Sequence, residues 1–198
     1  SCYLSKLLYA ELKNDNAVNS GNVHFSSTGT QVKNHSVQTK AAAMQRGWWM
    51  SINSGQQGPL YLGIDGGGSK CRVVLVTADN QLLGEGLGGP ANPLRGMKVA
   101  TDSILTATQQ ALTAAGMTFN EMSRLIVGAG LAGVNMPQYF KLFSEWKHPF
   151  ASFHLTTDLH IACIGAHNGG EGAVIIAGTG SCGLADVKGN ILDIGGHG

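Results

Sequence analysis

The feature that most constrains this chain is a glycine-rich turn between two apolar runs, within residues 61–76. The first run ends in Asp65, three consecutive glycines follow, and a second β-branched run begins after Ser69 and Lys70. This pattern predicts a strand, a tight turn and a second strand. Because glycine has no Cβ and tolerates positive φ, the backbone of such a turn can approach a ligand closely. An ordinary hairpin with a glycine-rich tip is the alternative interpretation.

Phosphate is the ligand that this turn suits best. Consecutive backbone N–H groups, with a hydroxyl and a lysine beside them, match phosphate oxygens. The expected phosphate contacts are Gly66, Gly67, Gly68, Ser69 and Lys70. Asp65 could hold a hydrated Mg²⁺, because this ion is usually bound by one or two carboxylates together with phosphates and waters. A Walker A loop is excluded, since Ser69 precedes Lys70 and a strand follows instead of a helix.

The composition limits the function classes. The 198 residues are 43% hydrophobic and 13% charged, with a formal net charge of +1, which is typical of a globular chain. No basic run supports nucleic-acid binding, and no apolar stretch reaches the roughly 18 residues of a membrane helix. The cysteines form no Cys-x-x-Cys pair, so we expect free thiols in a reducing cytoplasm. They are Cys2, Cys71, Cys163 and Cys182.

Residues 1–57 differ from the rest of the chain. Polar residues dominate from Asn14 to Lys40, with no sustained period of 2 or 3.6. We therefore expect a disordered or non-native leader, with Met44 and Met50 as alternative starts. The chain does not begin with Met and stops within a glycine-rich motif, so we also expect that it is cut at both ends.

The remaining pattern predicts an α/β domain over residues 58–168 and the beginning of a second domain over 169–198. A third strand at 81–87 would complete an antiparallel meander, and a helix is predicted over 97–115. A strand at 123–127 precedes a helix that Asn135 caps and that runs to about residue 146. A strand at 153–157, a helix at 160–166 and strands at 173–177, 184–187 and 191–194 follow. The last group repeats the opening strand, glycine turn and strand, so two similar halves are predicted.

Two further patterns offer alternatives. Gly128 to Gly133 fits G-x-G-x-x-G after a strand, with Asp158 at the end of the next strand, as in dinucleotide-binding proteins. The predicted helix begins only beyond these glycines, so a pyrophosphate would not meet its N-terminus. An NAD-binding oxidoreductase is therefore the less favoured alternative. His160 and His167 share a predicted helix, but without an acid or cysteine at ligand spacing we expect no metal site there.

A second glycine turn and an aspartate, together with the first turn, predict a site for phosphoryl transfer. Gly178, Thr179, Gly180 and Ser181 follow a strand, as the first turn does, so the two turns could contact phosphates from opposite sides. Phosphoryl transfer also needs a base near the acceptor hydroxyl. Asp158 lies between the turns in sequence and is the candidate. The alternative is a structural role as helix N-cap after Thr156 and Thr157.

With these motifs, the chain resembles the superfamily of sugar kinases, heat-shock cognate chaperones and actin. Within it, the chain resembles the N-acetylglucosamine and glucosamine kinases of the ATPase group that includes the acyl-CoA dehydratase activators. The resemblance runs from about Pro59 to the end. It rests on Gly63–Ser69, Asn92, Leu155–Asp158, Ala177–Ser181 and Gly195–Gly198.

The resemblance implies an actin-like ATPase (ribonuclease H-like) fold, a mixed sheet with flanking helices, with a complete first domain and a truncated second one. It implies that Asp158 is the base for the sugar 6-hydroxyl and that both turns bind ATP, with Asp65 near Mg²⁺. It further implies that Asn92, Gly195 and Gly196 contact the sugar. His197 stands where relatives often have Trp.

The function predicted from these features is a cytoplasmic, ATP-dependent hexosamine kinase that phosphorylates N-acetylglucosamine or glucosamine at the 6-hydroxyl. The resemblance places the adenosine contacts beyond Gly198, so we expect the chain to be inactive alone, and it also allows a homodimer. A non-catalytic, sugar-responsive regulator on the same fold is the alternative from another functional class. Such a regulator could dispense with the base.

Overall fold

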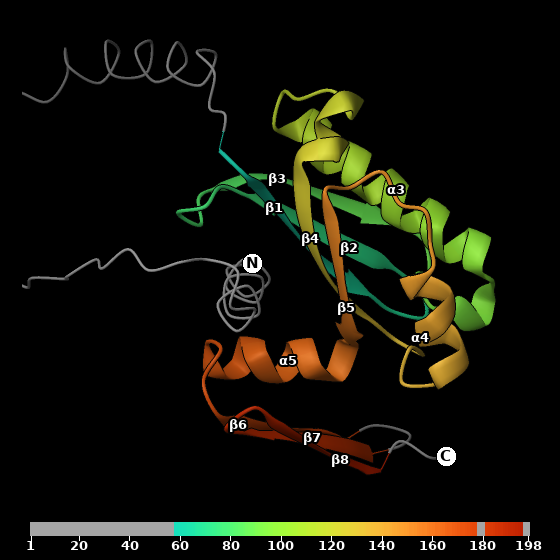
Figure 1. Cartoon of the computed structure of the whole chain (residues 1–198), viewed down its shortest axis with the longest axis vertical. Helices are drawn as coiled ribbons and strands as arrows, with labels where there is room; N and C mark the ends of the chain where they lie inside the picture. Colours follow the sequence, from blue (N-terminus) through green and yellow to red (C-terminus); the bar gives the residue numbers. More distant parts are fainter. Residues whose placement is uncertain (1–57, 178–180, 196–198) are drawn as a thin grey trace, which may run out of the picture. The chain divides into compact units, whose positions relative to one another are not determined.

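The structure is a computed structural model that describes residues 58–177 and 181–195. The predictions for residues 1–57, for Gly178, Thr179 and Gly180, and for Gly196 lie outside the described residues. The described residues form two sheets, one of five strands and one of three, with helices between and beside them (Figure 1).

The five-stranded sheet is mixed, as predicted, with strand order β3-β2-β1-β4-β5. Strands β1, β2 and β3 are antiparallel neighbours and form the expected meander, whereas β4 and β5 run parallel to β1. The strands are β1 (Leu60–Gly66), β2 (Cys71–Val76), β3 (Leu82–Gly88), β4 (Leu125–Leu131) and β5 (Ser152–Thr157).

Three α-helices pack against this sheet: α3 contacts β2 and β3, α4 contacts β5, and α5 contacts β1, β4 and β5. The predicted mixed sheet with flanking helices is confirmed. No helix in the described part of the chain is long and apolar enough to cross a membrane. The helical segments are η1 (Pro93–Arg95), α3 (Met97–Ala114), η2 (Phe119–Arg124), α4 (Pro137–Ser144) and α5 (Asp158–His167).

A row of glycines in β3 determines how closely α3 packs. A Cβ added to Gly84, Gly86 or Gly88 would lie 2.2, 1.9 or 2.3 Å from a backbone carbonyl oxygen of α3. Real Cβ atoms do not approach an oxygen so closely, so the absence of side chains lets the helix backbone contact the strand directly. These alternating glycines therefore form a packing surface, and any side chain there would push α3 away from the sheet.

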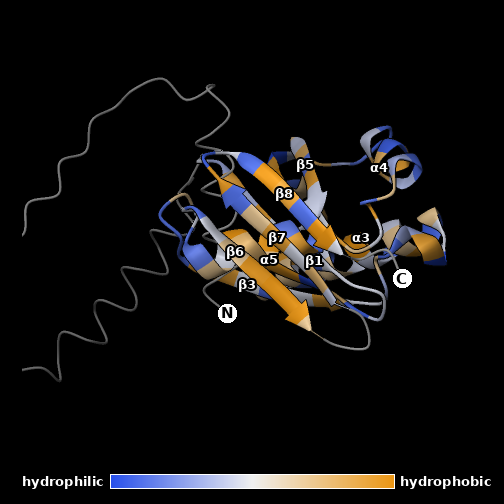
Figure 2. Ribbon diagram, turned by 90° about the horizontal axis from the view of Figure 1, so that it is seen from below, coloured by the Kyte–Doolittle hydropathy of each residue, from blue (hydrophilic) through white to orange (hydrophobic). Residues whose placement is uncertain are grey.

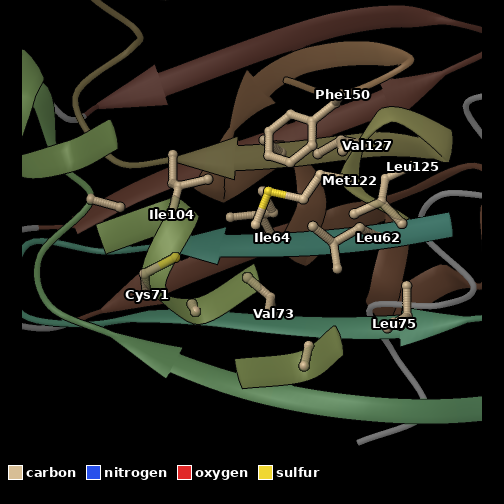
Figure 3. Close-up of a cluster of buried hydrophobic side chains, with 14 of the residues drawn as sticks. Leu62, Ile64, Cys71, Val73, Leu75, Ile104, Met122, Leu125, Val127 and Phe150 are labelled. Carbon is tan, nitrogen blue, oxygen red and sulfur yellow. The ribbon is translucent and has the colours of Figure 1, made fainter. Parts of the chain in front are cut away.

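The core lies between α3 and one face of the sheet. Alternating side chains of β1 and β2 point to this face, which explains why both strands are so apolar. Leu62, Ile64, Val73 and Leu75 are fully buried, and Met122 from η2 and Phe150 before β5 complete the cluster (Figure 3). Burial of these side chains is the main source of stability for the first sheet.

Four predicted elements had wrong bounds. The strand expected at 184–187 begins already at Ser181, and the helix expected at 160–166 spans Asp158–His167. The strand expected at 123–127 is β4, which begins at Leu125 and continues through two glycines to Leu131, because it pairs with both β1 and β5 along its length. The helix expected from Asn135 to residue 146 is the shorter α4. Its N-cap is Met136, which makes no side-chain capping bond, so Asn135 does not cap it.

The second sheet repeats the antiparallel meander, with order β6-β7-β8. Its strands are β6 (Gly172–Ala177), β7 (Ser181–Val187) and β8 (Asn190–Gly195). Helix α5 contacts β6 and β7, but apolar side chains of β6 and β8 remain exposed, with Ile175 at 81% and Ile194 at 75%. Figure 2 shows these strands with much of their length coloured as hydrophobic.

Candidate active site

The candidate site lies at the carboxyl ends of three parallel strands. Because β1, β4 and β5 run in the same direction, their ends meet at one edge of the sheet, where α/β proteins commonly bind ligands. Asp65 pairs with Gly130, and Gly130 pairs with Thr156, so the three residues form one row on the face that α5 covers. Neighbouring strands are about 4.8 Å apart, so the row places Asp65 and Thr156 about 10 Å apart.

Asp65 and Asp158 influence each other electrostatically at this edge. The pKa of Asp65 is raised above 3.8, first because partial burial of its carboxyl group disfavours the charged form, and second because of the negative charge of Asp158. Lys70 and Arg72 lower the pKa but do not compensate. Two carboxylates that repel each other at a sheet edge form a site that a cation would stabilise.

The glycine turn connects β1 to β2 directly. The Gly67 N–H donates to the Lys70 carbonyl at 2.9 Å, which closes the turn. A Cβ on Gly66 would lie 2.4 Å from the Leu131 side chain, whereas a Cβ on Gly68 would meet nothing within 4 Å. Gly68, Ser69 and Lys70 are exposed. The turn therefore presents its tip to open space, as phosphate binding requires.

The glycines of this turn do not use the positive φ that glycine tolerates. Gly66, Gly67 and Gly68 are not among the glycines with positive φ. The absence of a side chain matters instead for packing at Gly66 and for access at Gly68. The expected strand, turn and strand are confirmed.

Asn92 lies beside this turn. The Ala91 N–H donates to the Gly67 carbonyl at 3.0 Å, and Asn92 itself caps η1 by accepting from the Leu94 N–H through Oδ1 at 2.9 Å. A Cβ on Gly133, whose φ is +85°, would lie 2.6 Å from this oxygen. Because Oδ1 already accepts a hydrogen bond, the side chain offers mainly its Nδ2 donors to a ligand.

Asp158 is the first residue of α5, and it is not the N-cap. Thr157 caps the helix by accepting from the His160 N–H through Oγ1 at 3.1 Å. The Asp158 carboxylate accepts from the Leu159 N–H at 2.9 Å and is half-buried. The structural alternative for Asp158, a capping role, is therefore wrong, because a neighbouring threonine caps the helix.

The second sheet brings together two other predicted site residues. Ser181 begins β7 and Gly195 ends β8, and Gly195 pairs with Cys182. Gly195 has φ of +80°, and a Cβ there would lie 2.6 Å from the Ser181 carbonyl oxygen. A glycine is therefore needed where the chain leaves β8 next to the start of β7.

The G-x-G-x-x-G pattern has a packing explanation. Gly130 is a strand residue, and a Cβ there would lie 2.5 Å from the Ile161 side chain of α5. Gly133 accommodates Asn92, as described above. No helix starts directly after these glycines, since α4 begins at Pro137. The dinucleotide-binding interpretation therefore fails at this site.

Sequence reasoning missed the contact between Thr156 and His160, whose Oγ1 and Nδ1 atoms are 2.7 Å apart. It considered His160 only as a metal ligand. The available signal was the four-residue spacing between Thr156 and His160, which can bring two side chains together where a helix begins. The sequence did not show that the helix begins there, with Thr157 as its N-cap. The contact between Asn92 and Gly133 had no local signal, because it joins two separate loops.

The residues present are compatible with ATP and Mg²⁺. Three or more acidic, cysteine or histidine side chains do not gather into a metal site anywhere in the described ranges. Mg²⁺ seldom needs such a cage, because phosphates and waters supply most of its ligands. Asp65, with Asp158 near it, could supply a carboxylate to such a site, and the open glycine turn beside it could supply phosphate contacts.

The chain is similar in sequence to known sugar kinases. Glucosamine kinase of Vibrio cholerae is 41% identical over 137 residues, which cover 69% of this chain and 47% of that protein. The N-acetylmuramic acid/N-acetylglucosamine kinase of Clostridium acetobutylicum is 28% identical over 124 residues, covering 61% of this chain and 40% of that protein. The chain thus spans about half the length of these relatives.

A solved structure confirms the predicted actin-like ATPase fold class. The structure of a candidate N-acetylglucosamine kinase from Chromobacterium violaceum matches with a TM-score of 0.66 and 31% identity, over 71% of this chain and 50% of that chain. The model of the BadF/BadG/BcrA/BcrD ATPase family matches residues 62–198. The chain therefore belongs to the BadF/BadG/BcrA/BcrD ATPase family.

Proposed function

We propose that this chain is the N-terminal part of an ATP-dependent amino-sugar kinase that phosphorylates N-acetylglucosamine or glucosamine at the 6-hydroxyl. The observation that carries the proposal is the meeting of Asp65, Asp158 and an open glycine turn at the carboxyl ends of parallel strands. The kinases named above support the amino-sugar class. The free thiols Cys71, Cys163 and Cys182 and the use of ATP favour a cytoplasmic location.

Asp158 acts as the general base in this proposal. Its carboxylate takes the proton of the sugar 6-hydroxyl, the sugar oxygen forms a bond to the γ-phosphorus of ATP, and the bond from that phosphorus to ADP breaks. Helix α5 supports this role, because Asp158 occupies its first position and Thr157, not Asp158, is the cap. One carboxylate oxygen accepts from the Leu159 N–H, which leaves the other for a substrate.

The glycine turns bind the phosphates. Gly66, Gly67, Gly68, Ser69 and Lys70 would contact phosphate oxygens from one side, and Gly178, Thr179, Gly180 and Ser181 from the other. Asp65 would hold Mg²⁺ through its hydration shell. When bound, ATP would supply the phosphoryl group, and Mg²⁺ would neutralise the charge that develops on this group during transfer. Lys70 and Arg72 add positive charge near Asp65.

Asn92, Gly195 and Gly196 would contact the sugar. Asn92 supports this role because its Oδ1 is engaged by the Leu94 N–H. Its Nδ2 group can then donate to sugar hydroxyl or acetyl oxygens, which fixes the direction of the hydrogen bonds. An aspartate at this position could still cap η1 but would offer no donor.

The experiment joins this chain at residue 198 to the second half of the V. cholerae glucosamine kinase, and we call the product the fused kinase. Circular dichroism checks folding, and the natural V. cholerae kinase is the positive control. We expect ATP-dependent formation of a 6-phosphate on glucosamine or N-acetylglucosamine, detected by ADP release and product NMR. A folded fused kinase that binds either sugar without turnover would favour the regulator, and phosphate at another hydroxyl would contradict the assigned geometry.

A further inference from the structure

Two residues that flank Asp158 in the sequence, Thr156 and His160, form a hydrogen bond with each other. Thr156 is two residues before Asp158 at the end of β5, and His160 is two residues after it in the first turn of α5. The Thr156 Oγ1 and His160 Nδ1 atoms are 2.7 Å apart, and both side chains are half-buried. The pair therefore joins the strand to the helix across the residue that carries the carboxylate.

Two other contacts hold the same helical turn from different directions. The Thr157 hydroxyl accepts from the backbone N–H of His160 at 3.1 Å. The Ile161 side chain fills the space above Gly130, the residue that separates Thr156 from Asp65 in the lateral row. The capping bond fixes the helix backbone, and the Ile161 contact fixes its distance from the sheet. The Thr156–His160 pair adds a hydrogen bond between a side chain of this row and the helix.

Asp158 needs such a restraint because of its neighbour. Asp158 raises the pKa of Asp65 through its negative charge, so the two carboxylates repel each other. The contact that Asp158 makes with the Leu159 N–H lies within its own turn and moves with it. A base must stay aligned with the proton that it removes, and a displacement of about 1 Å can cost about 100-fold in rate.

We propose that Thr156 and His160 are positioning residues that hold the first turn of α5, and with it the Asp158 carboxylate, at the distance from Asp65 that proton removal requires. This inference rests on the proposed function of Asp158. Either ring tautomer of His160 can make the bond, since the threonine hydroxyl can donate or accept.

Substitutions separate this role from general packing. Thr156→Val keeps the shape and removes the hydroxyl, whereas Thr156→Ser keeps the hydroxyl. An asparagine amide can occupy the position of Nδ1, but a glutamine amide reaches that of Nε2. In the fused kinase we expect Thr156→Val and His160→Gln to lower kcat about 10- to 100-fold, with the sugar Kd from calorimetry unchanged. We expect Thr156→Ser and His160→Asn to retain most of the activity.

The double variant tests whether the two residues act as a unit. Thr156→Val combined with His160→Gln should be no slower than the slower single variant, because the same contact is lost in each. The positioning role would be overturned by additive losses in kcat or by equal losses in kcat for Thr156→Ser and Thr156→Val. It would also be overturned by a sugar affinity that falls in parallel with kcat.

A structural measurement keeps this test independent of turnover. Crystal structures of the fused kinase should show the Asp158 carboxylate displaced relative to Asp65 in Thr156→Val and unmoved in Thr156→Ser. An unmoved carboxylate in Thr156→Val would overturn the inference whatever the activity. Absence of turnover in the unsubstituted fused kinase would instead contradict the proposed function, while displacement in the valine variant would still support the restraint.

Discussion

The two antiparallel meanders of this molecule share a topology but differ in burial. In the first, Leu62 and Ile64 of β1 are fully buried beneath α3. In the second, Ile175 of β6 and Ile194 of β8 are 81% and 75% exposed. In the first meander, a row of glycines in β3 lets the backbone of α3 pack directly against the sheet. In the second, α5 contacts β6 and β7, and the described residues include no helix on the opposite face. Both meanders have apolar strands, so the difference in burial comes from whether a helix covers the apolar face and not from the strand sequences.

The largest contrast is expected for glycines in the two meanders. Gly86→Ala places a Cβ 1.9 Å from the Ala107 carbonyl, whereas Gly183→Ala places one 3.4 Å from the Val174 carbonyl. We expect Gly86→Ala to lower the free energy of unfolding by about 3 kcal/mol or more. Gly183→Ala should change it by less than about 0.5 kcal/mol. Urea denaturation of the 198-residue chain measures both, and equal costs would contradict the close contact of α3 with β3.

The second contrast concerns isoleucines. Ile64→Ala removes a fully buried side chain, so we expect a loss of about 2–5 kcal/mol in the free energy of unfolding. Ile175→Ala removes an exposed one, with an expected change of less than about 0.5 kcal/mol in the same chain. Thermal and urea denaturation provide the values. If the second half of the kinase covers β6, the cost of Ile175→Ala should rise in the fused kinase.

A smaller effect of opposite sign is expected at Asp65. Its pKa is raised in the folded state, so folding favours the protonated form. The loss of stability therefore develops as the pH rises from the unfolded pKa to the folded pKa, and it is complete above the folded pKa. Asp65→Asn should therefore raise the melting temperature at pH 7, by about 1–3 °C, and abolish kinase turnover. The difference in stability should disappear below about pH 3, where Asp65 is protonated in both the folded and the unfolded state. A lower melting temperature for Asp65→Asn at pH 7 would contradict this electrostatic account.

The mildest test compares thiols in corresponding strands. Burial, and secondarily the charge of Asp65, raise the pKa of Cys71 in β2 to about 12, while Cys182 in β7 is half-buried. With iodoacetamide at pH 8, peptide mapping should find Cys182 modified well before Cys71, because alkylation needs an accessible thiolate. Faster labelling of Cys71 would show that the first meander opens more readily than its burial implies.

The sequence was sufficient where the signal was local. The first hairpin was predicted by the apolar run that ends in Asp65, the glycine turn and the β-branched run that follows. The second meander was predicted from the same order of strand, glycine turn and strand. The strand pattern over residues 153–157 predicted that Asp158 lies at the end of a strand, although not that Thr157 caps the following helix. These elements depend on patterns within a few residues, which is where sequence rules are reliable.

The sequence was insufficient where contacts join distant segments. Strand β4 continues through Gly128 and Gly130 because it has partners on both sides, which its own composition does not reveal. The glycine at 133 is required by Asn92, and the one at 130 by Ile161. Read locally, these glycines suggested nucleotide binding, whereas the tertiary contacts assign them to packing.

The most direct test of the central claim is the turnover of Asp158→Asn in the fused kinase. The amide keeps the size of the side chain but cannot accept the proton of the sugar hydroxyl. We predict that kcat falls about 100- to 10,000-fold, while calorimetry still detects binding of the sugar and of ATP. Turnover equal to that of the unsubstituted fused kinase would contradict the assignment of Asp158 as the base.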